Sequence, residues 1–266
     1  MRWKVMLDFL RDIFSALSHA AGDSADKEEP APAPDVSTVD TVTGWAGEPP
    51  YRYIDVSRYQ GSIDWAQVAA AGYKGAMLKT VSTNRKISNR ADGLYIDPTF
   101  ETNYRNARDA GLDVGVYWYS AATTQAGLDA ELSMLKEAVR GKELTLPVAM
   151  DVEDSHLAVL NSQELTDHVA AALHEVEQMG FYAQLYTYTS FAKAHLFVGG
   201  AALHPYDVWL ADYTGKAPKV DFKYNSHQHT SKGSVPGISG NVDLNVTTLN
   251  YPKIIRKKGL TRLREV

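Results

Sequence analysis

The sequence contains no cysteine. Disulfide bonds and thiolate-bound metal ions are therefore excluded, and the fold must be held together by packing alone. An oxidising compartment is neither required nor excluded by this composition.

Long apolar runs are also absent, since no window approaches the roughly 20 apolar residues that a membrane-spanning helix requires. The basic start, Met1 to Lys4, is not followed by a continuous apolar stretch of about 7 to 15 residues, so we expect no secretory signal peptide of the usual form. Instead, apolar side chains recur at helical spacing and predict an amphipathic helix over residues 1–21: Trp3, Leu7, Leu10, Phe14 and Leu17. Docking on its own domain is the favoured role for residues 1–20, and contact with a membrane surface or a partner stays open.

Charge of either sign is not in large excess, because the formal net charge is -5 over 266 residues. Such a chain has no general electrostatic attraction to nucleic acid, and we expect no nucleic-acid partner. With 44% hydrophobic residues, the chain can bury one core of catalytic-domain size.

Composition divides the chain into four segments. Residues 22–50 are rich in Pro, Ala and acidic residues and contain little that could build a core, which predicts a disordered linker. Residues 51–250 carry the catalytic-size domain. Residues 251–266 form a basic segment, for which a solvated terminal helix is the first interpretation and a patch drawn to anionic wall polymers or a membrane the alternative.

Strand-like and helix-period segments alternate after Pro50. Helices that stop at glycine before a new strand, as at Gly72, Gly111 and Gly180, are typical of parallel βα units. Five or more such units favour a barrel or a doubly wound sheet. Residues 224–246 contain strands and turns without a helix, so we expect the last strands to be antiparallel or irregular, which gives an incomplete (β/α) barrel.

Two carboxylates stand out at the end of an apolar run, in the triplet Asp151-Val152-Glu153. In a strand, both would point to the same side. Because two neighbouring carboxylates are costly to ionise together, one tends to stay protonated, which suits acid catalysis of glycosidic-bond cleavage. Asp55 and Asp212 also fall near expected strand ends, where the working residues of such barrels lie, and Asp243 lies in the final segment 241–245. We expect these carboxylates to converge on one mouth of the barrel.

Several segments of the chain carry distinctive motifs: residues 53–65 (YIDVSRYQGSIDW), 77–80 (MLKT), 95–100 (YIDPTF) with Asn103-Tyr104, 114–117 (VGVY), 146–153 (LPVAMDVE), 209–213 (WLADY) and 235–245 (VPGISGNVDLN). In order and spacing, these segments resemble the motifs of glycoside hydrolase family 25 lysozymes. The resemblance covers about residues 51 to 250. It implies an α/β fold, a flattened and irregular TIM-like (β/α) barrel, acting at the bacterial cell wall as an N-acetylmuramidase on peptidoglycan.

The resemblance also implies roles for particular residues. Glu153 would be the general acid and Asp151 would support the developing charge or orient the substrate's acetamido group, while Asp55 and Asp243 complete the acidic cluster and keep the pKa of Glu153 raised. Substrate-binding candidates are the side chains Tyr117, Tyr186, Trp209, Tyr213 and Gln228. No cofactor and no metal ion are expected, and the chain is expected to be a monomer.

One strand departs from the family, which usually has Trp-Gln-Tyr where this chain has His227-Gln228-His229. A metal site at the two imidazoles is disfavoured because a third ligand is missing, so altered substrate fit is the preferred interpretation. The polar segment 82–93 is interpreted as a solvated loop, with a contact to the muramyl carboxylate or peptide stem as the alternative.

Two other functions stay open from the sequence. One is a wall-binding or structural protein that kept the barrel but lost turnover. The other is a glycosidase that acts on another polysaccharide, such as chitin.

Overall fold

The computed structural model describes residues 51–84 and 86–264, which belong to one compact unit of the chain. The helix expected over residues 1–21 and the linker expected over 22–50 lie outside the described residues. No helix in the described part is long and apolar enough to cross a membrane.

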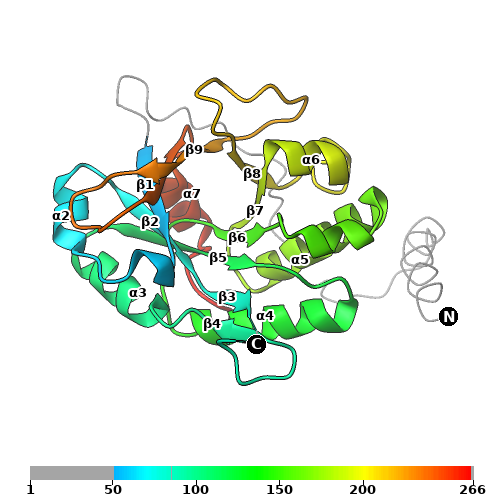
Figure 1. Ribbon diagram of the computed structural model, residues 1–266, viewed down its shortest axis with the longest axis horizontal. Coiled ribbons are helices and arrows are strands. Elements are labelled where there is room, and N and C mark those ends of the chain that lie inside the picture. Colours follow the sequence, from blue (N-terminus) through cyan, green and yellow to red (C-terminus); the bar gives the residue numbers. More distant parts are fainter. Residues whose placement is uncertain (1–50, 85, 265–266) are drawn as a thin grey trace, which may run out of the picture. The chain divides into compact units, whose positions relative to one another are not determined.

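A closed barrel of eight strands forms the centre of this unit (Figure 1). Around the barrel the strands follow the order β1-β10-β9-β8-β7-β6-β5-β2. Their bounds are β1 Tyr51–Val56, β2 Gly75–Lys79, β5 Asp113–Tyr119, β6 Val148–Asp151, β7 Ala183–Tyr188, β8 Asp207–Ala211, β9 Ser226–Gly233 and β10 Val242–Thr247. The predicted α/β barrel is therefore confirmed, and the doubly wound sheet is not formed.

In the described part of the chain, five helices lie in connections between strands, as the βα alternation predicts, and α7 follows the last strand. They are α2 Trp65–Ala70, α3 Phe100–Asp109, α4 Gln125–Val139, α5 Ser162–Gln178, α6 Thr189–His195 and α7 Tyr251–Lys258, with short 3-10 turns η1 Arg58–Gln60 and η2 Ser155–Val159. Side-chain caps define the starts of α2, α4, α5 and α7. At the start of α5, the Asn161 side chain accepts from the backbone N–H of Gln163 and Glu164, which satisfies donors that the helix itself leaves free.

The last strands differ in direction from one another. β10 is antiparallel to both β1 and β9, and the β9–β10 register shifts around Leu244, as expected for an irregular end. β9, however, is parallel to β8, so the expectation of antiparallel or irregular last strands holds for β10 and its pairing, not for the direction of β9. A parallel strand is possible there without a helix because the long connection 212–225 carries the chain back along the barrel.

The segment 82–93 belongs to a small hairpin outside the barrel. β3 Val81–Thr83 pairs antiparallel with β4 Leu94–Ile96. Between them, Arg90 forms an exposed ion pair with Asp92, with Nη2 2.6 Å from Oδ2. The described part of this hairpin does not line the pocket discussed below, in agreement with a solvated loop.

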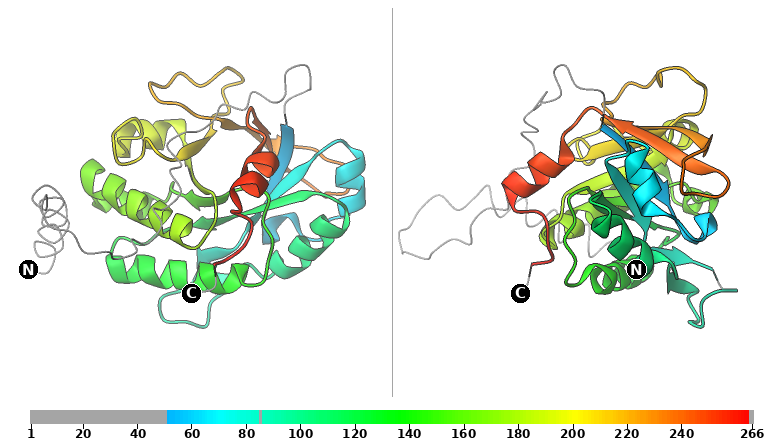
Figure 2. Two further views of the ribbon diagram at one scale, coloured as in Figure 1. Left: turned by 180° about the vertical axis from the view of Figure 1, so that it is seen from behind. Right: turned by 90° about the vertical axis from the view of Figure 1, so that its left-hand side faces the viewer.

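Helix α7 packs against the barrel with one face (Figure 2, left). Tyr251, Ile254 and Ile255 are buried in the same cluster as Tyr51 of β1. Lys253 and its basic neighbours remain exposed. The expected solvated helix is thus amphipathic: its basic face meets water and its apolar face adds to the core.

Close packing inside the barrel depends on glycine at one position in particular. A Cβ on Gly115 would lie 2.5 Å from the Met77 sulfur and 2.6 Å from the Pro147 carbonyl oxygen. Only hydrogen fits there, because real Cβ atoms do not approach other heavy atoms so closely. β5 can therefore lie against its neighbours and place Tyr117 and Tyr119 at the end of the barrel that carries the acids.

Candidate active site

Four carboxylates meet at one end of the barrel. Asp55 stands at the end of β1, and Asp151 and Glu153 stand at and just beyond the end of β6. Asp243 lies at the start of β10, but β10 runs antiparallel to β1, so Asp243 is paired directly with Asp55. The antiparallel direction of β10 thus places Asp243, at the start of its strand, beside the acids at the ends of β1 and β6.

These acids line a pocket of about 240 Å³. All nine predicted catalytic and substrate-binding residues border it, joined by Ser57, Tyr59, Gln60, Lys79 and Tyr119. Asp212 does not: its carboxylate accepts hydrogen bonds from the hydroxyls of Thr189 and Thr214, at 2.9 and 2.6 Å. The expectation that Asp212 joins the acids at the mouth is therefore wrong, because local hydroxyls hold it outside the pocket.

Asp55 is held by two side-chain amides. Its Oδ2 accepts hydrogen bonds from Gln228 Nε2 at 2.9 Å and from Asn245 Nδ2 at 2.8 Å. Burial raises the pKa of Asp55 well above its usual value and the nearby charge of Asp243 adds to this, whereas the two amide donors act in the opposite direction. Burial also raises the pKa of Asp243, to about 6. The two carboxyls are hydrogen-bonded to each other, and such a pair retains one proton near neutral pH.

Asp151 and Glu153 form the second pair of acids. Burial and the charge of Glu153 raise the pKa of Asp151 well above its usual value. Burial also raises the pKa of Glu153, and Asp243 adds to it. Asp151 is only 4% exposed, yet its Oδ1 has no hydrogen-bond partner in the described structure. A buried acceptor without a donor is costly, so this oxygen is available for a donor from a ligand.

Lys79, the last residue of β2, is a pocket side chain that the sequence did not single out. Among the described residues that border the pocket it is the one with a basic side chain. Its charge lowers the pKa of both Asp151 and Glu153, against the effect of burial. Its Nζ also lies 4.7 Å from the ring centre of Tyr119. Its place at a strand end, inside a motif already quoted, was the available signal.

The aromatic residues of the pocket divide into two kinds. Trp209 is 1% exposed, and its ring contacts Tyr186 edge-on at a centroid distance of 4.6 Å. Such a ring forms the floor of the pocket rather than an open platform. Tyr213 and Tyr59 are 53% and 73% exposed at its rim. The Arg58 guanidinium covers one face of Tyr59, 4.2 Å from the ring centre, and the exposed ring surface that remains can stack on a sugar.

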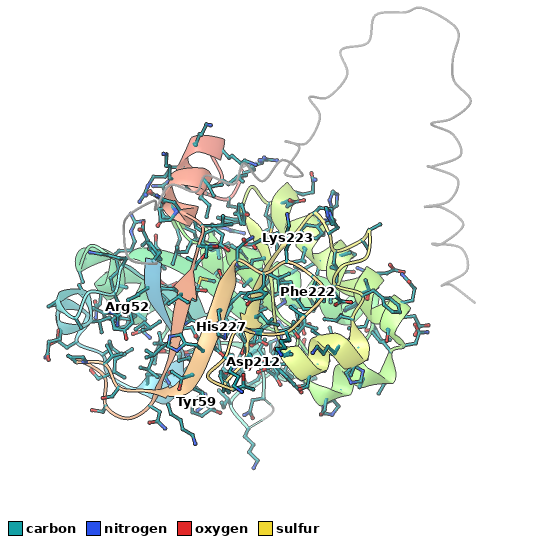
Figure 3. The ribbon with its side chains drawn as sticks, turned by 90° about the horizontal axis from the view of Figure 1, so that it is seen from above. Arg52, Tyr59, Asp212, Phe222, Lys223 and His227 are labelled. Carbon is teal, nitrogen blue, oxygen red and sulfur yellow. The ribbon has the colours of Figure 1, made fainter. Side chains whose placement is uncertain are left out.

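His227 and His229 lie on the opposite side of β9 from Gln228, so neither borders the pocket. His227 faces outward beside Asp212 (Figure 3), and its Nε2 is 3.0 Å from the Asp212 backbone oxygen. No group of three metal-ligating side chains occurs within residues 51–84 and 86–264. Strand alternation turns both histidines away from the pocket, and an effect on substrate fit stays a prediction.

Comparison with known proteins gives consistent matches. The family model described as "Glycosyl hydrolases family 25" matches residues 54–238. An autolytic lysozyme of Clostridium acetobutylicum is 29% identical over 192 residues, which cover 72% of this chain and 54% of that protein. An uncharacterized protein of Escherichia coli, YegX, is 30% identical over 195 residues, covering 73% and 68%. This chain thus spans about half the length of the first of these relatives.

A solved structure agrees in fold. The bacterial lysozyme from Streptomyces coelicolor superposes with a TM-score of 0.63 at 25% sequence identity, covering 78% of this chain and 96% of that one.

Proposed function

The chain belongs to glycosyl hydrolase family 25, and from this premise we propose that it is a lysozyme-type peptidoglycan hydrolase that acts at the bacterial cell wall. The bond cleaved is the β-1,4 linkage between N-acetylmuramic acid and N-acetylglucosamine. Glu153 is the general acid, and Asp151, Asp55 and Asp243 supply the charge around it. The observation that carries the proposal is the pairing of these four acids in one pocket with aromatic rings.

The transition state explains why such a pocket is suited to the reaction. Positive charge develops at the sugar carbon as the glycosidic bond breaks, and fixed negative groups stabilise it more than they stabilise the neutral sugar. With one proton retained by each pair, the four acids hold two negative charges and one proton remains available for the leaving oxygen. Tyr59 and Tyr213 at the rim offer stacking surfaces for neighbouring sugars.

The unpartnered Oδ1 of Asp151 suggests how the substrate sets the proton in place. Because Asp151 is more deeply buried than Glu153, burial alone favours a proton on Asp151 in the free protein. An acetamido N–H that donates to Asp151 Oδ1 would favour the ionised form of Asp151. The shared proton would then reside on Glu153, where the reaction needs it.

Substrate assistance completes the proposed cycle. The acetamido oxygen attacks the anomeric carbon, the glycosidic C–O bond breaks, and the Glu153 proton passes to the leaving oxygen. Water then attacks the same carbon and gives its proton to Glu153, which opens the cyclic intermediate. Asp151, ionised and hydrogen-bonded to the acetamido N–H, stabilises the positive charge of that intermediate. Two displacements at one carbon leave its configuration retained.

The test is reducing-end analysis of purified peptidoglycan after treatment with the wild-type chain, Glu153→Gln and Glu137→Gln. Glu137 is exposed on α4, and its substitution makes the same chemical change away from the pocket. We expect new N-acetylmuramic acid reducing ends with the wild type and Glu137→Gln, and a loss of about 100-fold or more with Glu153→Gln. Release from chitin oligomers instead would favour another glycosidase, and no release from either would favour a wall-binding protein.

A further inference from the structure

Gln228 is only 2% exposed, and both ends of its amide are hydrogen-bonded to protein groups. Its Oε1 accepts hydrogen bonds from the hydroxyls of Tyr186, at 2.9 Å, and Tyr213. Since both donors point at the oxygen, the NH₂ group must turn the other way, toward Asp55 Oδ2. Little of this amide is left to contact a sugar.

Asn245 is fixed in the same manner from the other side. Its Oδ1 accepts a hydrogen bond from the indole Nε1 of Trp209 at 2.8 Å. An indole nitrogen only donates, so this contact fixes which end of the Asn245 amide is the oxygen. The Nδ2 is therefore also directed at Asp55 Oδ2.

We infer that Gln228 and Asn245 are positioning residues that act through Asp55: together they clamp its Oδ2 and so keep the Asp55–Asp243 pair singly charged while the enzyme works. The inference rests on the proposed function and deepens it. It also gives Gln228 a role other than the sugar contact expected from the sequence.

The physical basis is the preference of N–H donors for the charged form of a carboxyl. Two donors on one oxygen oppose the burial that drives Asp55 toward its neutral form. If one donor is removed, the Asp55–Asp243 pair takes up its second proton at a higher pH. Below that pH the pair no longer carries a negative charge. Glu153 then feels a weaker field from Asp243, and the sugar cation loses a stabilising charge.

Other ionisable groups also face the Asp55–Asp243 pair, and none of them is substituted in the variants Asn245→Leu and Gln228→Met. From the neighbouring elements they are Tyr53, Lys79, Tyr117, Asp151, Glu153, Tyr186 and Tyr213. A change of pH response upon removal of an amide alone can therefore be assigned to the clamp.

The first experiment measures kcat/KM on peptidoglycan against pH for the full chain and the variants Asn245→Leu and Gln228→Met. We expect the acidic limb of the profile to move up by about one pH unit, since a hydrogen bond to a charged group has about that strength. His229→Gln is the matched control: it changes the same strand on its outer side, and its limb should stay in place. A uniform loss of rate with an unmoved limb in both clamp variants would overturn the inference.

The second experiment does not depend on activity, so it separates the clamp from the proposed function. Carboxyl carbon resonances of ¹³C-aspartate-labelled full chain are titrated, and Asp55 and Asp243 are assigned with Asp55→Asn and Asp243→Asn. Asn245→Leu should raise both titration midpoints of the Asp55–Asp243 pair. Tyr213→Phe removes a hydroxyl that donates to Gln228, from a half-exposed side chain, and should raise the midpoints less. If Asn245→Leu does not fold, Tyr213→Phe decides: midpoints equal to the wild type would contradict the clamp, even for a chain that cleaves nothing.

Discussion

Replacing Asp243 with Asn should make the protein more stable and less active, and the gain in stability should depend on pH. In the folded protein, burial raises the pKa of Asp243 from 3.8 to about 6. An acid whose pKa is raised on folding binds protons more tightly in the folded state, so stability is lost as pH rises between these two values. Above about pH 7 the full penalty applies, and asparagine removes it.

The size of the effect follows from the same interval. The difference between 3.8 and about 6 corresponds to about 3 kcal/mol, at 1.36 kcal/mol per pH unit. Asp243 is only partly buried, so screening by water reduces the expected gain to about 1 to 2 kcal/mol. The amide introduced by this substitution can also donate to Asp55 in place of the shared proton. A gain of this size corresponds to roughly 2 to 8 °C in Tm.

Urea unfolding of wild type and Asp243→Asn at pH 3.5, 5, 6 and 8 measures the effect. The difference in free energy of unfolding should be near zero at pH 3.5, where both side chains are neutral, and should reach its plateau above pH 7. Activity should fall because the one negative charge of the pair then resides on the more deeply buried Asp55 instead of on Asp243. A difference that is constant with pH, or a destabilised variant at pH 8, would refute the reasoning.

Three further changes test other parts of the structure. Lys79→Met removes the charge that lowers the pKa of Glu153, so the basic limb of the activity profile should move to higher pH, and a limb that moves down would contradict the assignment. Gly115→Ala places a methyl group within 2.7 Å of three atoms. It should lower the free energy of unfolding, measured in urea, by about 1 to 3 kcal/mol or more. A variant as stable as wild type would show that β5 has room for the methyl group. The double variant His227→Trp, His229→Tyr changes only the outer side of β9 and should leave kcat/KM on peptidoglycan within about twofold, whereas a large change would place these side chains in the sugar site.

The sequence by itself determined the fold class and the composition of the site. Alternation of strand and helix periods is a local property, and glycine stops such as Gly72 and Gly111 mark where each helix ends, so the βα order could be read residue by residue. The acidic triplet at 151–153 was visible because period two in a strand places both carboxyls on one side. The family motifs then added Asp55 and Asp243 to the same pocket.

Only the tertiary structure decided how those residues act on one another. Where no helix lies between two strands, their direction is not encoded in the local pattern, so neither the parallel β9 nor the direct pairing of Asp243 with Asp55 could be read from the sequence. Hydrogen-bond partners come from distant segments: Gln228 and Asn245 both reach Asp55, and the Thr189 hydroxyl holds Asp212 away. The protonation of the acids is a tertiary property for the same reason, because burial and neighbouring charges set a pKa and both exist only once the barrel has closed.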